Sequence, residues 1–382
     1  MELRKFVAPE IVFGLHARKL AGQYAKNLGA RHVLLVTDPG VVAAGWAGDV
    51  STSLTEAGLR PAVFSGVSAN PRDYEVMKGL EAYRAQSCDA IVAVGGGSPI
   101  DCAKGIGIVA SNGGSILDFE GVDQVPVPMP PLICVPTTGG TSADISQFAI
   151  ISDPEERYKA AIISKAVVPD VSLVDPATLT TMDPFLAACT AFDALVHGIE
   201  AFVSNACSSL TDIHALAAIR LIYPNLLRSL REPANLPLRG EVMLGSLEAG
   251  LAFSNASLGA VHAMAHSLGG MSDLAHGECN ALLLEHVLAF NYPVASERYE
   301  RLGDAMNLDL RGMTRQEKEA AILAAVVALR EQAGITATLR QRGVHRTDIP
   351  ELAEHALSDP CVITNPRPVN RRDLEVIYEE AL

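Results

Sequence analysis

An α/β domain built on a parallel sheet, followed by an all-α domain, is the fold that this sequence predicts. In the first half, short apolar runs alternate with amphipathic stretches, as they do in strand–helix units. From Pro184 onward the chain is rich in Ala, Leu and Glu and has helical periodicity. Its 382 residues are 49% hydrophobic and 19% charged, which is sufficient for two cores. We place the boundary near residue 180, which gives domains 1–180 and 181–382.

The predicted strands of the first domain are short apolar runs that stop at turn residues. They are Arg31–Thr37, Ala62–Phe64, Ala90–Val94, Leu132–Val135 and Val171–Val174. Amphipathic stretches over 41–58 and 72–86 separate the first three runs and predict helices. Because apolar strands that alternate with helices form sheets covered on both faces, we expect a parallel sheet.

The second domain has helical periodicity nearly to the end of the chain. The windows that predict helices are 184–204, 209–231, 239–254, 259–271, 279–291 and 315–334. No strand pattern interrupts them. We therefore expect this domain to be all-α.

Charge and cysteine content exclude several classes of protein. The net charge of -14, without a basic cluster, argues against a nucleic-acid partner. The uncharged stretches 124–143 and 249–272 are interrupted by polar residues, so we expect no membrane span. Met1–Lys5 leads into a mixed segment rather than an apolar signal core, so export is not expected. Seven scattered cysteines without a C-x-x-C pair indicate reduced thiols and a cytoplasmic protein.

Two polar glycine loops follow predicted strands. Gly95–Ser98 comes directly after Ala90–Val94, and Thr137–Ser142 comes after Leu132–Val135. Glycines let a backbone approach a phosphate, and the helix that follows adds free N–H groups. The spacing is not G-x-G-x-x-G, and a single such loop is equally well a tight structural turn. Because two loops follow strands of one sheet, we favour a Rossmann-like, dinucleotide-binding domain.

Asp38 follows the first strong strand and has two interpretations that we weigh equally. A carboxylate there can accept hydrogen bonds from ribose hydroxyls and would repel a 2′-phosphate, which favours NAD over NADP. Alternatively, Asp38-Pro39-Gly40 is only a turn.

The second half contains a pattern that is typical of a metal site. Asp193 and His197 lie four residues apart, as do His262 and His266, so each pair shares one helix face. His276 follows in a glycine-bearing turn. A single histidine here would more often be a hydrogen-bonded core residue, but two spaced pairs favour a metal. Imidazoles and a carboxylate suit Fe²⁺, Zn²⁺ or another first-row ion, and ligand type alone does not choose among them.

These motifs together resemble the iron-containing (group III) alcohol dehydrogenases, and the resemblance spans essentially the whole chain. The residues that carry it are Gly95–Asp101, Pro136–Thr141, Asp193–His197, His262 and His266 with His276–Gly277, and Asp359–Cys361 with Thr364–Arg367. The resemblance implies one metal ion, Fe²⁺ with Zn²⁺ as the alternative, held by Asp193, His197, His262 and His276. His266 would then be a non-ligand near the substrate that takes part in proton transfer.

The resemblance also implies positions for NAD and for the substrate. The NAD residues would be Asp38, Asn70, Gly96, Gly97, Ser98, Asp101, Thr138, Thr141 and Lys159. Phe148, Phe253 and Cys361 would line the substrate pocket beside the metal. The sequence departs from the family pattern where Gly139 replaces an Ala and Asp144 stands in place of a Glu. Phe148 stands where some relatives have a polar residue, which predicts a more apolar pocket.

The expected function is that of an iron-dependent NAD(H) alcohol dehydrogenase, an enzyme that reversibly oxidises a primary alcohol to an aldehyde by hydride transfer. Its partners would be the alcohol or aldehyde and a second copy of the chain, in a homodimer or larger homo-oligomer. One alternative is a polyol oxidoreductase of the glycerol dehydrogenase type. Another is a regulatory protein that resembles these enzymes and senses alcohols.

Overall fold

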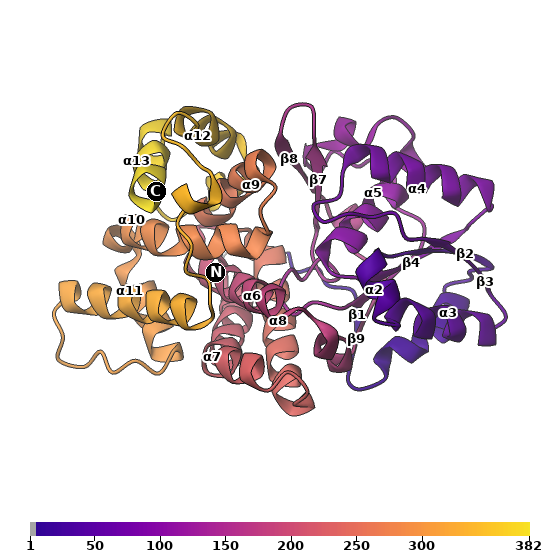
Figure 1. Ribbon diagram of the computed structural model, residues 1–382, viewed down its shortest axis with the longest axis horizontal. Coiled ribbons are helices and arrows are strands. Elements are labelled where there is room, and N and C mark those ends of the chain that lie inside the picture. Colours follow the sequence, from indigo (N-terminus) through magenta and orange to yellow (C-terminus); the bar gives the residue numbers. More distant parts are fainter. Residues whose placement is uncertain (1–4) are drawn as a thin grey trace. The chain divides into compact units, whose positions relative to one another are not determined.

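The computed structural model describes residues 5–382, which form two compact units (Figure 1). The α/β unit is Val7–Met182, and the helical unit is Asp183–Leu382 together with Lys5 and Phe6. The sequence assigned 1–180 to the first domain, whereas the Phe6 ring lies 5.4 Å from that of His214 in the helical unit. An aromatic contact made by so short a segment leaves no signal in composition.

A parallel six-stranded sheet with the strand order β1-β9-β6-β4-β2-β3 forms the centre of the α/β unit. Its strands are β1 (Glu10–Phe13), β2 (His32–Val36), β3 (Arg60–Phe64), β4 (Ala90–Gly95), β6 (Leu132–Pro136) and β9 (Val171–Val174). The predicted parallel sheet is therefore confirmed. Strand β1 was not predicted, although Ile11–Phe13 form a short apolar run, and none of its residues is fully buried.

Two hydrophobic cores cover the two faces of this sheet, because alternate strand residues point to opposite sides. Helices α4 (Asp73–Ala85) and α5 (Gly97–Asn112) pack on one face, and α1 (Ala21–Asn27) and α3 (Trp46–Glu56) on the other (Figure 1).

The single helix expected over 41–58 is wrong. The segment forms α2 (Pro39–Ala43) and α3, which are separated at Gly45 with a φ of 87°. Only glycine adopts this left-handed conformation without strain.

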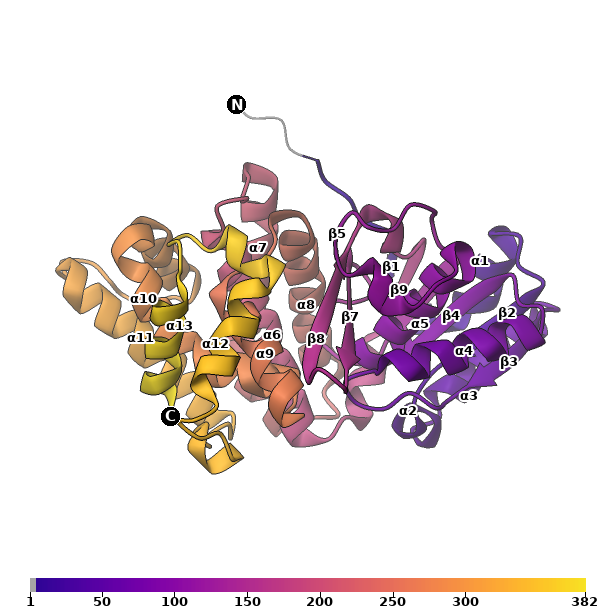
Figure 2. The same ribbon diagram turned by 90° about the horizontal axis from the view of Figure 1, so that it is seen from above.

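A second, smaller sheet of the α/β unit has the order β5-β8-β7 and was not predicted. Its strands are β5 (Gly121–Val122), β7 (Phe148–Asp153) and β8 (Tyr158–Ile163), and the last two form an antiparallel hairpin (Figure 2). Short 3-10 turns connect the elements of both units: η1 (Ala17–Leu20), η2 (Ile116–Phe119), η3 (Lys165–Val167), η4 (Pro176–Thr181), η5 (Arg340–Arg342) and η6 (Pro360–Thr364).

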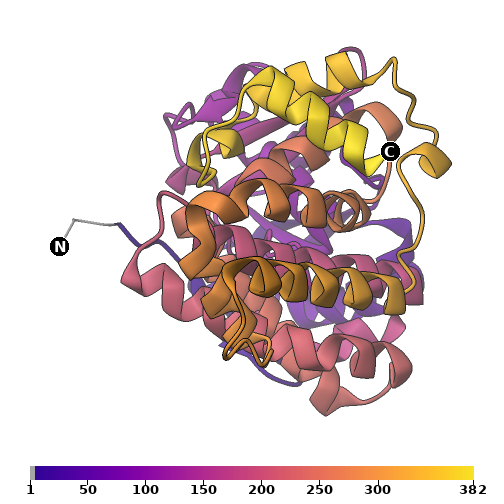
Figure 3. The same cartoon turned by 90° about the vertical axis from the view of Figure 1, so that its left-hand side faces the viewer.

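The helical unit confirms the predicted all-α architecture. Its helices are α6 (Pro184–Val203), α7 (Ser209–Arg231), α8 (Leu236–Ala256), α9 (Ala260–Ser272), α10 (His276–Ala305), α11 (Arg315–Gln332), α12 (Ile349–Ser358) and α13 (Arg371–Ala381). The last two, drawn in yellow, pack against each other (Figure 3). The window 279–291 is shorter than α10, which continues past Pro293 with non-helical angles at Ala295.

Helix α6 is the core of the helical unit and packs against α7, α8 and α10. By length and mean hydropathy, 1.5, it could cross a membrane, but 94% of that window is buried in the structure. Asp183 caps its first turn by accepting hydrogen bonds from the N–H groups of Phe185 and Leu186. Most of α6 is thus buried and apolar. Its few buried polar residues include Asp193 and His197, the first two candidate ligands.

Candidate metal and nucleotide sites

Four predicted ligands from three helices of the helical unit converge. Asp193 and His197 come from α6, His262 from α9 and His276 from α10, and one potential ligand atom of each lies within 4.8 Å of the others. From Asp193 Oδ1, the imidazole Nε2 atoms of His197, His262 and His276 lie at 3.9, 3.6 and 3.6 Å. His276 is partly exposed, and the other three are buried.

The start of α10 approaches the backbone of α6 very closely. His276 is the first residue of α10, so the expectation that it lies in a turn is wrong. The next residue must be glycine, because a Cβ atom on Gly277 would lie 2.1 Å from the carbonyl oxygen of Cys189. This close packing brings the His276 ring to Asp193.

Glu200 holds the ring of His262 and was missed by the sequence analysis. Its Oε2 lies 2.6 Å from His262 Nδ1, and its Oε1 accepts a hydrogen bond of 2.8 Å from the N–H of Val261. With Nδ1 as the donor, the Nε2 lone pair of His262 faces Asp193. A signal existed, since Asp193, His197 and Glu200 share one face of an otherwise apolar helix.

The electrostatics of the site fit a cation. Burial alone would raise the pKa of Asp193, but His197, His276 and His262 outweigh it and hold that pKa far below its usual range. Burial lowers the pKa of His262, but its hydrogen bonds to Asp193 and Glu200 outweigh this effect and raise it to about 9. The group therefore attracts protons in the absence of another positive charge.

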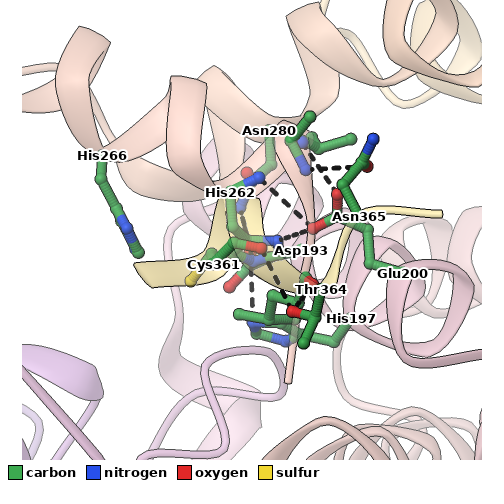
Figure 4. Close-up of polar contacts among 12 residues, drawn as sticks. Asp193, His197, Glu200, His262, His266, Asn280, Cys361, Thr364 and Asn365 are labelled. Carbon is green, nitrogen blue, oxygen red and sulfur yellow. Dashed lines mark hydrogen bonds and ion pairs between the residues drawn. The ribbon is translucent and has the colours of Figure 1, made fainter. Parts of the chain in front are cut away.

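Asn280, a second residue that the sequence analysis missed, reaches the same ligand atoms. Its Nδ2 donates a hydrogen bond of 2.6 Å to Asp193 Oδ1 and lies 3.1 Å from His262 Nε2 (Figure 4). The Nε2 of His276 lies at the same distance of 3.1 Å. A partly positive amide group thus lies where the lone pairs of three ligands meet. Three imidazoles and one carboxylate that converge in this way are a donor set for a first-row divalent metal.

His266 lies outside this group of ligands. Its Nδ1 is 2.7 Å from Asp359 Oδ2, and the other oxygen of Asp359 accepts a hydrogen bond of 2.8 Å from the N–H of Cys361. Burial alone would raise the pKa of Asp359, but the neighbouring His266 and these hydrogen bonds lower it. Burial raises the pKa of the Cys361 thiol well above its usual value, so the thiol stays protonated.

The predicted pocket residues belong to different units. Phe253, on α8, stacks on His197 with a centroid distance of 4.2 Å, and Cys361 lies buried in η6 near His266. Phe148 begins β7 in the α/β unit, where its carbonyl oxygen accepts a hydrogen bond of 2.6 Å from Lys104 Nζ. The structure thus places Phe253 and Cys361 in the helical unit with the ligands and Phe148 in the other unit.

The two glycine loops of the α/β unit touch each other. They follow β4 and β6, which are neighbours with Gly95 opposite Pro136. A Cβ atom on Gly96 would lie 2.7 Å from Thr138 Cγ2, and one on Gly97 would lie 3.1 Å from Thr141 Cγ2. These glycines therefore let the two loops lie in contact, where any side chain would clash.

The partly exposed start of α5 beside these loops has the properties of a phosphate site. Gly96 caps α5, and Gly97 and Ser98 are its first residues, so the positive end of a long helix faces the loops. The hydroxyl Oγ1 of Thr138 is buried and has no hydrogen-bond partner among residues 5–382. A buried hydroxyl beside free helix N–H groups suits the phosphates of a dinucleotide.

The remaining predicted NAD residues lie at three other places of the α/β unit. Asp38 Oδ1 caps α2 by accepting a hydrogen bond of 2.9 Å from the N–H of Val41, which fits the structural interpretation and leaves Oδ2 for a ribose. Asn70 Oδ1 accepts a hydrogen bond of 2.7 Å from Lys159 Nζ. On α5, burial raises the pKa of Asp101 to about 7, although Lys104 and Lys159 oppose the shift.

Two family matches, one to each unit, come from the comparison with known proteins. Residues 8–176 match the family described as iron-containing alcohol dehydrogenase, and residues 187–382 match the C-terminal part of the Fe-containing alcohol dehydrogenase family. The chain belongs to the iron-containing alcohol dehydrogenase family. The family implied by the sequence motifs is therefore confirmed.

Several members of the iron-containing alcohol dehydrogenase family are similar along their whole length. The chain is 38% identical to 1,3-propanediol dehydrogenase of Klebsiella pneumoniae, over 98% of both chains. It is 34% identical to NAD-dependent methanol dehydrogenase of Bacillus methanolicus, over 99% of both. A solved structure of 1,3-propanediol oxidoreductase has a TM-score of 0.96 and 38% identity over 100% of both chains. The chain described here is therefore an alcohol oxidoreductase, and the alternative of a regulatory protein is not favoured.

Proposed function

We propose that the protein uses Fe²⁺ and NAD(H) to interconvert a small primary alcohol and its aldehyde. The observation that carries this proposal is the convergence of Asp193, His197, His262 and His276 on one point. These residues would hold the iron, with Zn²⁺ as the competing ion. The names of two relatives, 1,3-propanediol dehydrogenase and NAD-dependent methanol dehydrogenase, support NAD and a short alcohol.

When bound, the metal supplies a Lewis acid for the alcohol oxygen, and NAD⁺ accepts the hydride. The chain's own residues would manage the proton. Since Asp359 takes the Nδ1–H of His266, the Nε2 of that ring is left as a base for the alcohol proton. Glu200 fixes the orientation of His262, and Phe253 shields one face of the His197 ring from water.

The glycine loops would bind the NAD phosphates. Gly96, Gly97 and Ser98 form the partly exposed start of α5, and Thr138 and Thr141 lie next to the two glycines. Further predicted contacts with the dinucleotide are those of Asp38, Asn70, Asp101 and Lys159. Asp38 would face the ribose hydroxyls with Oδ2 and would repel a 2′-phosphate, which supports NAD rather than NADP.

The proposed pocket is mostly apolar. In the helical unit, Phe253 would contact the carbon chain of the substrate, and Cys361 would present a neutral thiol. Phe148, in the α/β unit, is a further predicted pocket residue. We also propose a cytoplasmic location, which the seven free cysteines support. A homodimer or larger homo-oligomer is supported by the exposed Phe13 and Leu15 at the edge strand β1.

The experiment that tests this function starts from protein made metal-free with a chelator under anaerobic conditions. Samples reloaded with Fe²⁺ or Zn²⁺ are assayed for NADH formation with ethanol, 1-propanol and 1,3-propanediol. We expect Fe²⁺ to restore the largest rate, with NADP⁺ a poorer acceptor. If Fe²⁺ restores no more activity than chelator alone, the iron assignment is wrong. If no alcohol or aldehyde reacts with either metal, the proposed reaction is wrong.

A further inference from the structure

Asn280 occupies a special position beside the candidate ligands. It follows His276 by one turn of α10, so both side chains lie on the same helix face, and it is fully buried. Its Nδ2 contacts three acceptor atoms that belong to three of the four ligands. We propose that Asn280 is a positioning residue of the metal centre, which gathers the ligand atoms before the metal binds and restrains Asp193 afterwards. This inference rests on the metal site of the proposed function.

The first part of the role concerns the metal-free protein. There, Asp193 Oδ1 lies 3.6 Å from the Nε2 atoms of His262 and His276, whereas Asn280 Nδ2 lies 2.6 to 3.1 Å from all three atoms. Lone pairs that face each other in a buried space repel unless a positive group lies between them. The Nδ2 of Asn280 is such a group without a full charge. It can therefore hold the ligand atoms together without the charge of a protonated His262, which would repel an incoming cation.

The amide of Asn280 points its Nδ2 toward the ligands, and its Oδ1 is buried without a hydrogen-bond partner among residues 5–382. A buried carbonyl oxygen without a donor is unfavourable. An asparagine that only filled space would gain nothing from this orientation, whereas one that serves the ligand atoms would.

The second part of the role concerns the loaded protein. An imidazole Nε2 has one lone pair and must give it to a metal, so Asn280 would lose its hydrogen bonds to His262 and His276. A carboxylate oxygen has further lone pairs. The hydrogen bond of 2.6 Å from Asn280 to Asp193 Oδ1 can therefore persist, as is common for residues that orient metal-ligating carboxylates.

Two variants test the inference with metal binding as the readout. Metal-free wild type, Asn280→Leu and Asn280→Asp are titrated with Co²⁺ in competition with a chelator, and thermal unfolding is followed with and without Co²⁺. Asn280→Leu keeps the branched shape of the side chain and removes the amide, so we expect Co²⁺ binding that is about 10- to 100-fold weaker. Asn280→Asp puts a second carboxylate beside Asp193, which destabilises the metal-free protein and enlarges the increase in Tm on loading.

Asn291→Leu is the matched control. Asn291 is also a buried asparagine on α10, and it exchanges hydrogen bonds of 2.9 and 2.8 Å with Asn365 rather than with a ligand. We expect this control to unfold at a lower temperature but to bind Co²⁺ as wild type does.

The possible outcomes separate the two proposals. If wild type binds no Co²⁺, the metal site itself is wrong. If wild type binds Co²⁺ and Asn280→Leu binds it equally tightly, only the role of Asn280 is wrong. Where Asn280→Leu does not fold, Asn280→Asp decides, since an increase in Tm on loading no larger than that of wild type would contradict the role.

Discussion

The metal centre and the glycine loops are built on opposite principles. In the helical unit, four side chains with lone pairs converge, and their positions are restrained by Glu200 and Asn280. In the α/β unit, the absence of side chains at Gly96 and Gly97 lets the two loops pack closely at the start of α5. The metal centre should therefore be sensitive to the removal of atoms and the loops to their addition, and variants of each kind sharpen this contrast.

The largest effect is expected for Asp193→Ala. The change removes the only carboxylate of the ligand set and leaves three neutral rings, so metal should be lost. Without the Lewis acid, several kcal/mol of transition-state stabilisation disappear, on the order of a thousandfold or more in rate. Metal content and NADH formation measure the result.

Asp212→Ala is the control for this change, because Asp212 is also an ion-paired aspartate of the helical unit, with Arg298 as its partner. It should retain metal and most of the activity. Full metal content in Asp193→Ala would instead contradict the ligand assignment.

The next largest effect is expected for Asp359→Asn. Asp359 lies beside the metal centre but is not a predicted ligand. Without a carboxylate at 2.7 Å, the Nδ1–H of His266 loses its charged acceptor, and the other nitrogen becomes a poorer base. We expect kcat/KM to fall about 100-fold with an altered pH profile, while metal content stays unchanged. A fall in kcat/KM with the wild-type pH profile would indicate a purely structural contribution.

A smaller effect is expected when an atom is added to the loops. In Gly96→Ala, the new Cβ would lie 2.7 Å from Thr138 Cγ2, and overpacking of this kind costs about 1–3 kcal/mol. We expect NAD⁺ to bind on the order of 10- to 100-fold more weakly, with metal content unchanged. NAD⁺ titration by calorimetry measures this.

Gly48→Ala serves as the control, because a Cβ atom there, within α3, meets nothing within 4 Å. It should leave NAD⁺ affinity unchanged and stabilise the helix by about 0.5–1 kcal/mol. Equal NAD⁺ affinity in both variants would mean that the loops do not bind the cofactor.

The residues of the metal centre differ in how well the sequence predicted them. The spacing of Asp193 and His197 on one helix predicted their common direction, because helical periodicity fixes it. The spacing of His276 and Asn280 carried the same signal, but it was not used because His276 was expected in a turn. That Asn280 also reaches Asp193 depends on how α10 packs against α6. Glu200 lay on the same face of α6 and could have been found.

Local patterns also explain which elements of the fold were predicted. Buried strands such as β2 and β4 form uninterrupted apolar runs and were found. The hairpin β7–β8 was missed although it is largely buried, because the chain between β6 and β9 contains no helix that would have marked it as a separate sheet. It carries Phe148 and Lys159, whose surroundings were therefore not predictable from their neighbours in sequence.

The smallest expected effect concerns Asp101, a predicted NAD residue with a charge that burial disfavours. Because its pKa in the folded protein is raised to about 7, above the unfolded value, its contribution to stability is complete below the unfolded pKa and is lost as the pH rises through about 7. Asp101→Asn removes this loss. In coenzyme-free protein, the variant should therefore gain stability relative to wild type between about pH 5 and about pH 8. Urea unfolding at both pH values measures the difference.

The exposed Asp309 is the control. Hydrogen bonds from Arg311 lower its pKa, so both pH values lie above its titration, and Asp309→Asn should show no such change in stability. If the difference in unfolding free energy between Asp101→Asn and wild type were the same at both pH values, the carboxylate would be better solvated than its burial indicates. The α/β unit would then lack, at this position, a buried charge like that of Asp193 in the metal centre.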